Sequence, residues 1–231
     1  LWLLARRPRA AAVLEAFMGT EMAAGNVLYD AHEAAALAPM LRTDGAAAAM
    51  YSPHELRVES RTALPRLAAW LAERHGVRFL FGEAVLEVQC PHVRTARREL
   101  FAERVVLCPG TELNGVGALA LAKHGLQLTR LQMLRVRPEP GFVLGAAVMS
   151  DLSLVRYGGY AALPAAAALL QQLQEEEPAC LAAGVHLIAV QSADSTLVVG
   201  DSHHGFSTPE PFADAAVDEL ILRQLRQTLD L

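Results

Sequence analysis

The sequence predicts an α/β protein of the mixed α+β kind, built as two subdomains. Helical patterns and runs that are typical of parallel strands dominate residues 50–115. Segments that alternate between apolar and polar residues, as antiparallel strands do, dominate residues 126–206. The 231 residues are 53% hydrophobic, which is enough to bury one large core or two small ones. We therefore expect two subdomains and place segment boundaries after residues 49 and 128.

The N-terminal part predicts strands that alternate with helices. Residues 1–7, LWLLARR, suit a strand, and the alanine-rich residues 8–25 favour a helix. A short strand is expected at NVLYD, residues 26–30. Asp30 followed three residues later by Glu33 is the pattern of a helix N-terminus closed by a capping box.

The middle of the chain predicts one long helix followed by strands. Residues 60–76 form a helical pattern that Gly76 ends. Residues 77–90, VRFLFGEAVLEVQC, predict two short strands, and residues 92–101 predict a hairpin without a strong turn signal. The apolar run at 105–108, VVLC, is typical of a strand that is buried on both faces.

The C-terminal part predicts an antiparallel sheet with two helices. Residues 126–140 and 152–160 each read as an antiparallel strand, and residues 185–203 as a hairpin. Residues 163–184 favour a helix as far as a proline near their end, and residues 209–231 favour a terminal helix.

Composition excludes several classes of protein. The net charge of −5 argues against a nucleic-acid surface, and no apolar run is long enough to span a membrane. The three widely spaced cysteines form no disulfide framework, which favours a reducing, cytoplasmic location. Because the chain begins with an apolar Leu1 and not with methionine, we expect a segment of a longer protein or a processed chain.

The order of these segments resembles the FAD-dependent oxidoreductases of the D-amino-acid oxidase, glycine oxidase and sarcosine oxidase superfamily. In that family a helix leads into a strand with glycine and valine at fixed spacing, then a hairpin, then a strand that ends in a small-residue turn. The matching positions of the first strand are Gly76, Val77, Gly82, Val85 and Val88. The stretches SPHELRVES, LQMLRVRPEPG and LVVGDSHHG are similar to a branch proposed to act in phosphonate metabolism.

The resemblance implies an FAD cofactor and the oxidation of an amine or amino acid, such as an aminophosphonate, by hydride transfer to the flavin. It implies a partial FAD-binding subdomain over residues 50–128 and an antiparallel-sheet substrate subdomain over the rest. The sequence departs from the family because it has no GxGxxG followed by an acidic residue, and no C-terminal glycine-rich segment. The alternative is a truncated or degenerate relative that is not catalytic and binds no FAD.

The resemblance places three parts of the chain at the cofactor. The turn at Pro109 and Gly110 would line the FAD, where a residue without a side chain lets backbone approach closely. Val85 would contact the adenine side through its backbone, and Gln132 lies on a strand that faces the substrate cavity. The alternatives are an ordinary turn at Gly110 and plain core strands at the other two positions.

Four residues are candidates for binding the substrate. His54 and Arg57 precede the long helix in a polar loop, and a guanidinium pairs well with carboxylate or phosphonate oxygens. The resemblance gives Arg156 and Tyr157 the role of holding the acid group of a small-molecule amine. Solvated loop charges and ordinary cross-strand packing are the alternatives.

His203 is the candidate base. Asp201 stands two residues before it, so that the two side chains can share one face of a strand, with Asp201 orienting His203; a structural turn is the alternative. His203 and His204 are neighbours and point to opposite faces of a strand, so we expect no metal ion at this pair. The sequence leaves the oligomeric state open.

Overall fold

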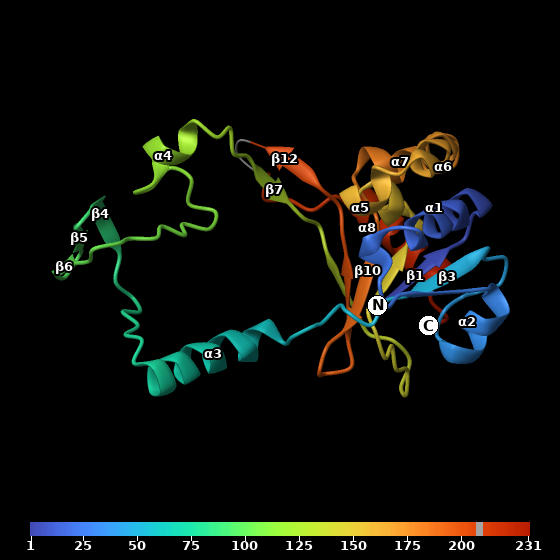
Figure 1. Ribbon diagram of the computed structural model, residues 1–231, viewed down its shortest axis with the longest axis horizontal. Helices are drawn as coiled ribbons and strands as arrows, with labels where there is room; N and C mark the ends of the chain where they lie inside the picture. The colour runs from blue at the N-terminus through green and yellow to red at the C-terminus, as the bar shows by residue number, and fades with distance from the viewer. Residues whose placement is uncertain (207–209) are drawn as a thin grey trace. The chain divides into compact units, whose positions relative to one another are not determined.

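The computed structural model describes residues 1–206 and 210–231, which divide into two compact units. The first unit comprises Leu1–Val58, Thr129–Gly205 and residues 210–231. The second comprises Glu59–Leu128 together with Phe206. Figure 1 labels the elements of both.

A seven-stranded mixed sheet forms the centre of the first unit. Its strands, in spatial order, are β2 (Val27–Tyr29), β3 (Ala48–Tyr51), β1 (Trp2–Ala5), β9 (Val148–Ser150), β10 (Ile188–Gln191), β11 (Leu197–Gly200) and β8 (Leu134–Val136). The pair β1–β9 is parallel and the other neighbours are antiparallel. The strand predicted at the N-terminus and the hairpin predicted over 185–203 are thereby confirmed.

Helices surround this sheet. They are α1 (Pro8–Met18), α2 (Ala31–Leu37), α5 (Gly158–Ala161), α6 (Pro164–Glu176), α7 (Pro178–Ala182) and α8 (Ala215–Thr228), with 3-10 turns η1 (Glu21–Ala23) and η2 (Asp151–Val155). The predicted capping box of α2 is confirmed. Asp30 Oδ1 accepts from the Glu33 backbone N–H at 2.8 Å, and the Glu33 carboxylate accepts from the Asp30 N–H at 3.1 Å.

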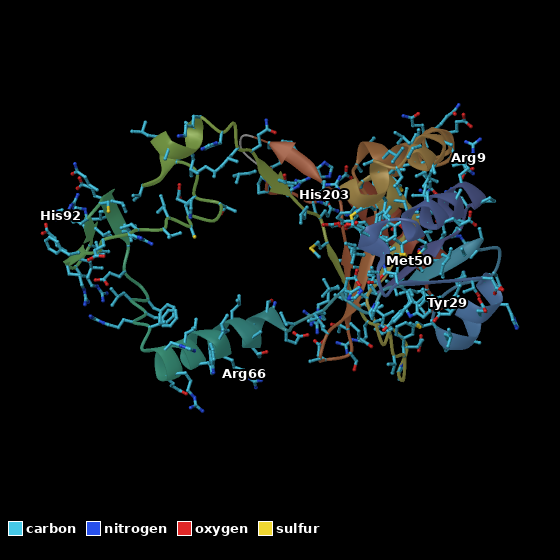
Figure 2. All side chains as sticks on the ribbon, in the orientation of Figure 1. Arg9, Tyr29, Met50, Arg66, His92 and His203 are labelled. Atoms are coloured by element: carbon cyan, nitrogen blue, oxygen red, sulfur yellow. The ribbon has the colours of Figure 1, made fainter. Side chains whose placement is uncertain are left out.

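The hydrophobic core lies in the first unit. All four residues of β1 are buried, so both faces of this strand are covered. Helix α1 packs on β1, β3 and α6, and α8 packs on β9 and β11. Side chains crowd around the buried Met50 (Figure 2). Every buried apolar side chain in the described part of the molecule belongs to this unit.

The second unit holds a long helix and a small antiparallel sheet. Its elements are α3 (Ser60–His75), β4 (Val85–Gln89), β5 (His92–Thr95), β6 (Glu99–Phe101) and α4 (Ala118–Ala122). Gly76 ends α3 in the left-handed region at φ +65°, as predicted. The predicted hairpin is the pair β5–β6. Apolar side chains of this unit stay largely exposed: Phe81 stacks on Phe79, yet it is 77% exposed. A separate two-stranded sheet joins β7 (Leu128–Arg130) to β12 (His204–Phe206).

The parallel strands predicted in the second unit are wrong. Residues 105–108 and 77–80 form no strand, and the strands of the sheet β4–β5–β6 are antiparallel. Val106 is 86% exposed. The physical reason is that an apolar run becomes a strand only when neighbouring strands accept its backbone hydrogen bonds, and no strand of the described residues does so here.

Two predicted antiparallel strands are also corrected. Residues 126–140 contain two short strands, β7 and β8, and not one long strand. Residues 152–160 contain η2 and α5 in place of a strand. The Ser153 carbonyl accepts from the N–H groups of Arg156 and Tyr157 at 3.2 and 3.1 Å. These local hydrogen bonds form a turn in place of the expected hydrogen bonds to a neighbouring strand.

A buried ion pair ties β1 to η2. Arg7 follows β1 and donates from Nη1 to both carboxylate oxygens of Asp151, at 2.9 and 3.1 Å. The Asp151 side chain is only 2% exposed. Arg7 also donates from Nε to Glu176 at 2.6 Å and lies 3.6 Å from Glu177. One guanidinium thus holds three segments of the first unit together.

None of the helices in the described residues is both long and apolar enough to cross a membrane.

Candidate functional site

A cavity of about 470 Å³ opens in the first unit beside η2, α6 and the segment that precedes β10. Apolar side chains form most of its wall. The polar residues that line it are Arg156, Gln174 and His186. An apolar cavity with a few polar groups is the usual form of a small-molecule site, so the surroundings of Arg156 and His186 are the first place to look for chemistry.

Next to this cavity lies a cluster of four polar side chains, those of Tyr157, His186, Asp201 and His203. The Tyr157 hydroxyl lies 3.0 Å from Nε2 of His186. Nδ1 of His186 lies 3.1 Å from Oδ1 of Asp201, and Nδ1 of His203 lies 3.9 Å from the same oxygen. The rings of His186 and His203 meet edge to face with centroids 5.1 Å apart. Of the residues predicted from sequence, the structure thus brings Tyr157, Asp201 and His203 together; Figure 2 labels His203.

Local hydrogen bonds fix His186 and His203 in place. The hydroxyl of Ser153 donates to the backbone carbonyl of His186 at 2.7 Å, and that of Ser150 does so at 3.4 Å. The His203 N–H donates to the carbonyl of Ala183 at 3.1 Å. Gly184 lets these segments approach: at its φ of +65°, a Cβ would lie 3.0 Å from His203 Cβ and 3.1 Å from its backbone.

Burial controls the electrostatics of the cluster. It lowers the pKa of His186; the Asp201 carboxylate opposes this effect, and the Arg156 guanidinium adds to it. Burial also lowers the pKa of His203; there too the Asp201 carboxylate opposes the effect and the Arg156 guanidinium adds to it. Burial and, secondly, the Asp201 charge raise the pKa of Tyr157, so its hydroxyl keeps its proton at neutral pH.

Arg156 is the exposed cation of the site. It caps the C-terminal end of η2 and lines the cavity. Its guanidinium makes no hydrogen bond or ion pair with residues 1–206 or 210–231. Its charge is close enough to lower the pKa values of His186, His203 and Tyr157. Arg156 therefore offers a planar set of donors to an anion that enters the cavity.

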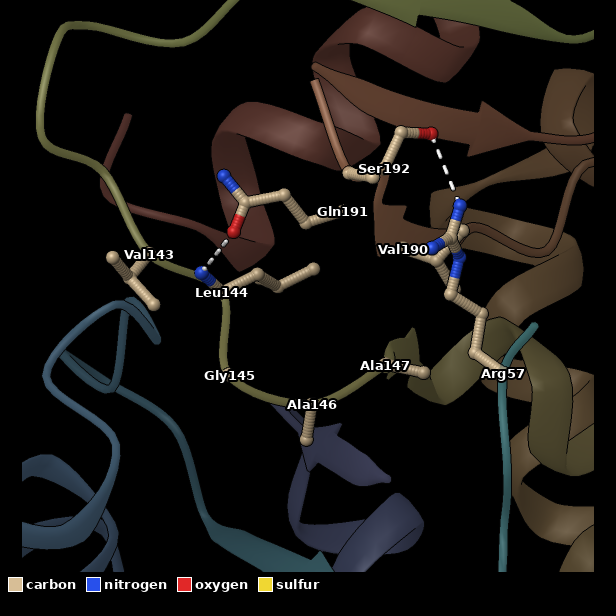
Figure 3. A pocket seen from close by; sticks show the side chains of 10 residues that line it. Arg57, Val143, Leu144, Gly145, Ala146, Ala147, Val190, Gln191 and Ser192 are labelled. Carbon is tan, nitrogen blue, oxygen red and sulfur yellow. Dashed lines mark hydrogen bonds between the residues drawn. The ribbon is translucent and has the colours of Figure 1, made fainter. Parts of the chain in front are cut away.

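Arg57 belongs to a different pocket of the first unit. Its Nη2 donates to the Ser192 hydroxyl at 3.1 Å beside a cavity of about 330 Å³. Figure 3 draws this hydrogen bond and the residues that line the cavity. Gln191 lines the same pocket. Its side chain already makes an intramolecular hydrogen bond, because its Oε1 accepts from the Leu144 N–H at 2.9 Å. This cavity and the one beside Arg156 share no lining residue, and strand β10 lies between His186 and Ser192 in the chain. The structure therefore does not bring Arg57 to Arg156.

His54 and Gln132 make structural contacts. His54 Nε2 lies 2.7 Å from the carbonyl of Ala24. Gln132 is buried, and its side chain binds the start of α8: Nε2 donates to the Asp214 carbonyl at 2.7 Å and to Asp218 at 2.5 Å, and Oε1 accepts from the Asp214 N–H at 2.9 Å. These bonds use the donors and acceptor of the amide within the first unit.

The other residues expected at the cofactor lie in the second unit. Val85 pairs with Thr95 at the start of β4, and Pro109 and Gly110 lie in a loop. At Gly110 the backbone has a φ of +61° and nothing lies within 4 Å of the place of a Cβ, so this turn is open to its surroundings. Among the described residues, no strand leads through a glycine-rich loop into a helix that could hold a pyrophosphate. The fit to FAD is therefore limited to this turn.

His186 is the residue that sequence reasoning left without a role. It stands between Val185 and Leu187, where an apolar run predicts only a buried strand. A histidine in such a run is a weak signal, and nothing in its spacing from Tyr157 or His203 indicates contact. The hydrogen bonds of η2 and the chain reversal between β10 and β11 bring it to the centre of the cluster.

The fold is similar to those of two glycine oxidases and an L-proline dehydrogenase. The glycine oxidase of Bacillus cereus ATCC 14579 matches with a TM-score of 0.67 at 12% identity, covering 99% of this chain and 55% of that one. The glycine oxidase of Geobacillus kaustophilus gives 0.65 at 18%, covering 99% and 53%. The L-proline dehydrogenase of P. horikoshii gives 0.69 at 15%, covering 100% and 57%. The chain thus spans little more than half the length of these structures.

The family follows from a match over almost the whole chain. The model of the FAD dependent oxidoreductases, DAO, matches residues 1–230, and the chain belongs to this family. FAD is the cofactor of the family. A comparison with curated proteins gave no match.

Proposed function

We propose that this chain forms the substrate-binding part of an FAD-dependent oxidoreductase that oxidises a small amine carrying an acid group. Family membership supports the redox class. The observation that carries the substrate class is Arg156, an exposed guanidinium without an ion pair among the described residues, on the wall of a cavity that Leu152 and Val155 also line. When bound, FAD supplies the hydride acceptor for oxidation at the carbon next to nitrogen.

Arg156 binds the acid group of the substrate. A carboxylate or a phosphonate accepts two parallel N–H bonds from a guanidinium, and the apolar wall strengthens such bonds by excluding water. Val155 and Leu152 beside Arg156 suit the short carbon chain of an amino acid or an aminophosphonate.

Tyr157 orients the same acid group. Its oxygen accepts from Nε2–H of His186, with the two atoms 3.0 Å apart, and its own O–H then donates to the substrate anion. The raised pKa of Tyr157 keeps that donor protonated at neutral pH. Arg156 and Tyr157 therefore supply charge and direction to one end of the substrate, and the amine is left to face the cofactor.

A spectrum with added substrates tests the proposal. The purified chain is mixed with FAD, and bleaching of the flavin band is followed without oxygen for glycine, D-alanine, 2-aminoethylphosphonate and its N-methyl form. Ethylamine, which lacks an acid group, is the control substrate. We expect bleaching by at least one of the four acids and none by ethylamine. A chain that retains no flavin absorbance after unbound FAD is removed supports the alternative, a relative that is not catalytic.

Arg156→Met tests the anion site, with Arg137→Met as the matched control. Loss of a charged hydrogen bond worth about 1.5–3 kcal/mol should raise KM by about 10- to 150-fold. Exposed Arg137 lies outside the cavity, so its variant should keep the original KM. Equal KM values for the two variants would remove Arg156 from this role.

A further inference from the structure

We propose that His186, Asp201 and His203 form a binding site for one divalent transition-metal cation, such as Zn²⁺. The ligand atoms would be Nδ1 of His186, Oδ1 of Asp201 and Nδ1 of His203. One ligand atom from each of the three residues lies within 4.8 Å of the other two, and both Nδ1 atoms lie within 4 Å of Oδ1 of Asp201. The proposal is independent of the proposed oxidoreductase function.

The three atoms lack hydrogen bonds although they are buried. Nδ1 of His186, Oδ1 of Asp201 and Nδ1 of His203 each have an exposed area close to zero, and none has a hydrogen-bond partner in the described residues. The His186 side chain as a whole is only 2% exposed. Buried polar atoms without partners are rare and costly, and here three of them converge on one point. A cation between them would satisfy all three at once.

A single proton would satisfy fewer of these atoms. Nδ1 of His186 and Oδ1 of Asp201 lie 3.1 Å apart, but their orientation does not meet the requirement of a hydrogen bond. Nδ1 of His203 lies 3.9 Å from the same oxygen, which is too far for a direct bond. A metal ion needs lone pairs directed at a common centre, and does not need the atoms to point at one another.

The distances and the donor set suit a transition metal. Zn²⁺ binds nitrogen and oxygen at about 2.0–2.2 Å, so two ligand atoms of a tetrahedral site lie roughly 3.3–3.5 Å apart. The observed separations of 3.1 and 3.9 Å lie on either side of this value. Two imidazoles with one carboxylate favour Zn²⁺ or Fe²⁺ over Mg²⁺ and Ca²⁺, which prefer oxygen ligands.

The site has a rigid frame and an entrance. The carbonyl of His186 is held by the Ser153 hydroxyl at 2.7 Å, and the N–H of His203 by the Ala183 carbonyl at 3.1 Å. His186 lines the cavity of about 470 Å³, through which a cation and its remaining water ligands can enter.

The site differs from the one that the sequence excluded. Neighbouring His203 and His204 were expected to face opposite ways, and His204 does not belong to the cluster. His186 takes its place from a separate segment. Metal at Nδ1 of His186 leaves the ring proton on Nε2, which then donates to Tyr157, and such outer contacts orient metal-binding histidines.

Titration of the metal-free chain with CoCl₂, followed by visible absorption, tests the site, and ZnCl₂ calorimetry gives the stoichiometry. We expect one ion per chain. Asp201→Asn and His203→Gln should each weaken Co²⁺ binding by more than the roughly 10- to 100-fold that changes to outer contacts cost. Tyr157→Phe should weaken binding within that range. His204→Gln is the matched control and should bind as the unaltered chain does.

Thermal unfolding without metal separates a lost ligand from a lost fold. A variant that unfolds at the temperature of the unaltered chain, but gains no stability from ZnCl₂, supports the site. If either Asp201→Asn or His203→Gln fails to fold, the Co²⁺ affinity of the other variant tests the site. Absence of Co²⁺ binding to the unaltered chain, or equal binding by Asp201→Asn, His203→Gln and His204→Gln, would overturn the proposal.

Discussion

Gly184→Ala should destabilise the protein more than the same substitution at a glycine that also has a positive φ but has no atoms close to the place of a Cβ. The backbone at Gly184 has a φ of +65°, where an L-residue costs about 1–2 kcal/mol. A new Cβ would also lie 3.0–3.1 Å from the Cβ and backbone of His203, and backbone atoms cannot rotate away. The control is Gly45→Ala, because Gly45 has a similar φ of +70° with nothing within 4 Å of a Cβ.

The difference between these two variants measures the contact with His203. Overpacking of this kind costs about 1–3 kcal/mol. It also stretches the bond from the His203 N–H to the Ala183 carbonyl, whose worth is about 0.5–1.5 kcal/mol. We therefore expect a loss of about 1–2 kcal/mol for Gly45→Ala and of about 2–5 kcal/mol for Gly184→Ala.

Urea denaturation at equilibrium measures both losses, and the slopes of the transitions must agree for the comparison to be valid. If the free energies of unfolding of the two variants agree within about 0.5 kcal/mol, the contact with His203 carries no cost, and the reasoning on Gly184 fails. A second readout is available, since a displaced His203 should also weaken Co²⁺ binding in Gly184→Ala and not in Gly45→Ala.

Two further predictions concern the core of the first unit. Arg7→Met leaves the buried Asp151 carboxylate without its main partner and should cost about 3–5 kcal/mol by urea denaturation. Adding Asp151→Asn should recover part of that loss, and a double variant as unstable as the sum of the single ones would contradict the pairing. Burial raises the pKa of the Cys180 thiol from its ordinary value of 9.0 to about 11. The folded chain should therefore expose only Cys90 and Cys108 to a thiol reagent at pH 8, and labelling of all three at equal rates would refute this. Because the unfolded thiol ionises first, the stability due to Cys180 should fall as pH rises from 9.0 towards 11.

Local sequence signals determined many elements of this protein. The Asp30–Glu33 capping box, the end of α3 at Gly76 and the hairpin β10–β11 depend on contacts between residues close in sequence. Such contacts need no distant partner, so the residue pattern is sufficient to predict them. The order of these segments also identified the family, which the match over residues 1–230 confirms.

The site residues were named from sequence only in part. The sequence named Arg156, Tyr157 and His203 as site candidates, and the structure places these three around one cluster. The roles of these residues stay predictions. His54 and Arg57 were predicted as substrate-binding residues on the same kind of evidence as Arg156 and Tyr157. In the structure, however, Arg57 lines a different pocket. The type of a residue indicates what its side chain can bind, but it does not indicate which other side chains lie close to it.

Tertiary structure alone decided the rest. Val105 to Cys108 has the composition of a buried strand, yet it forms none, because a strand requires backbone partners that the described neighbours do not supply. Residues 152–160 alternate like a strand, yet they turn, because the Ser153 carbonyl accepts from the nearby N–H groups of Arg156 and Tyr157. The meeting of His186 with Tyr157, Asp201 and His203 joins three separate segments. No periodicity within one segment can encode that meeting, since it follows from how the strands of the sheet pair and where their connections fold back.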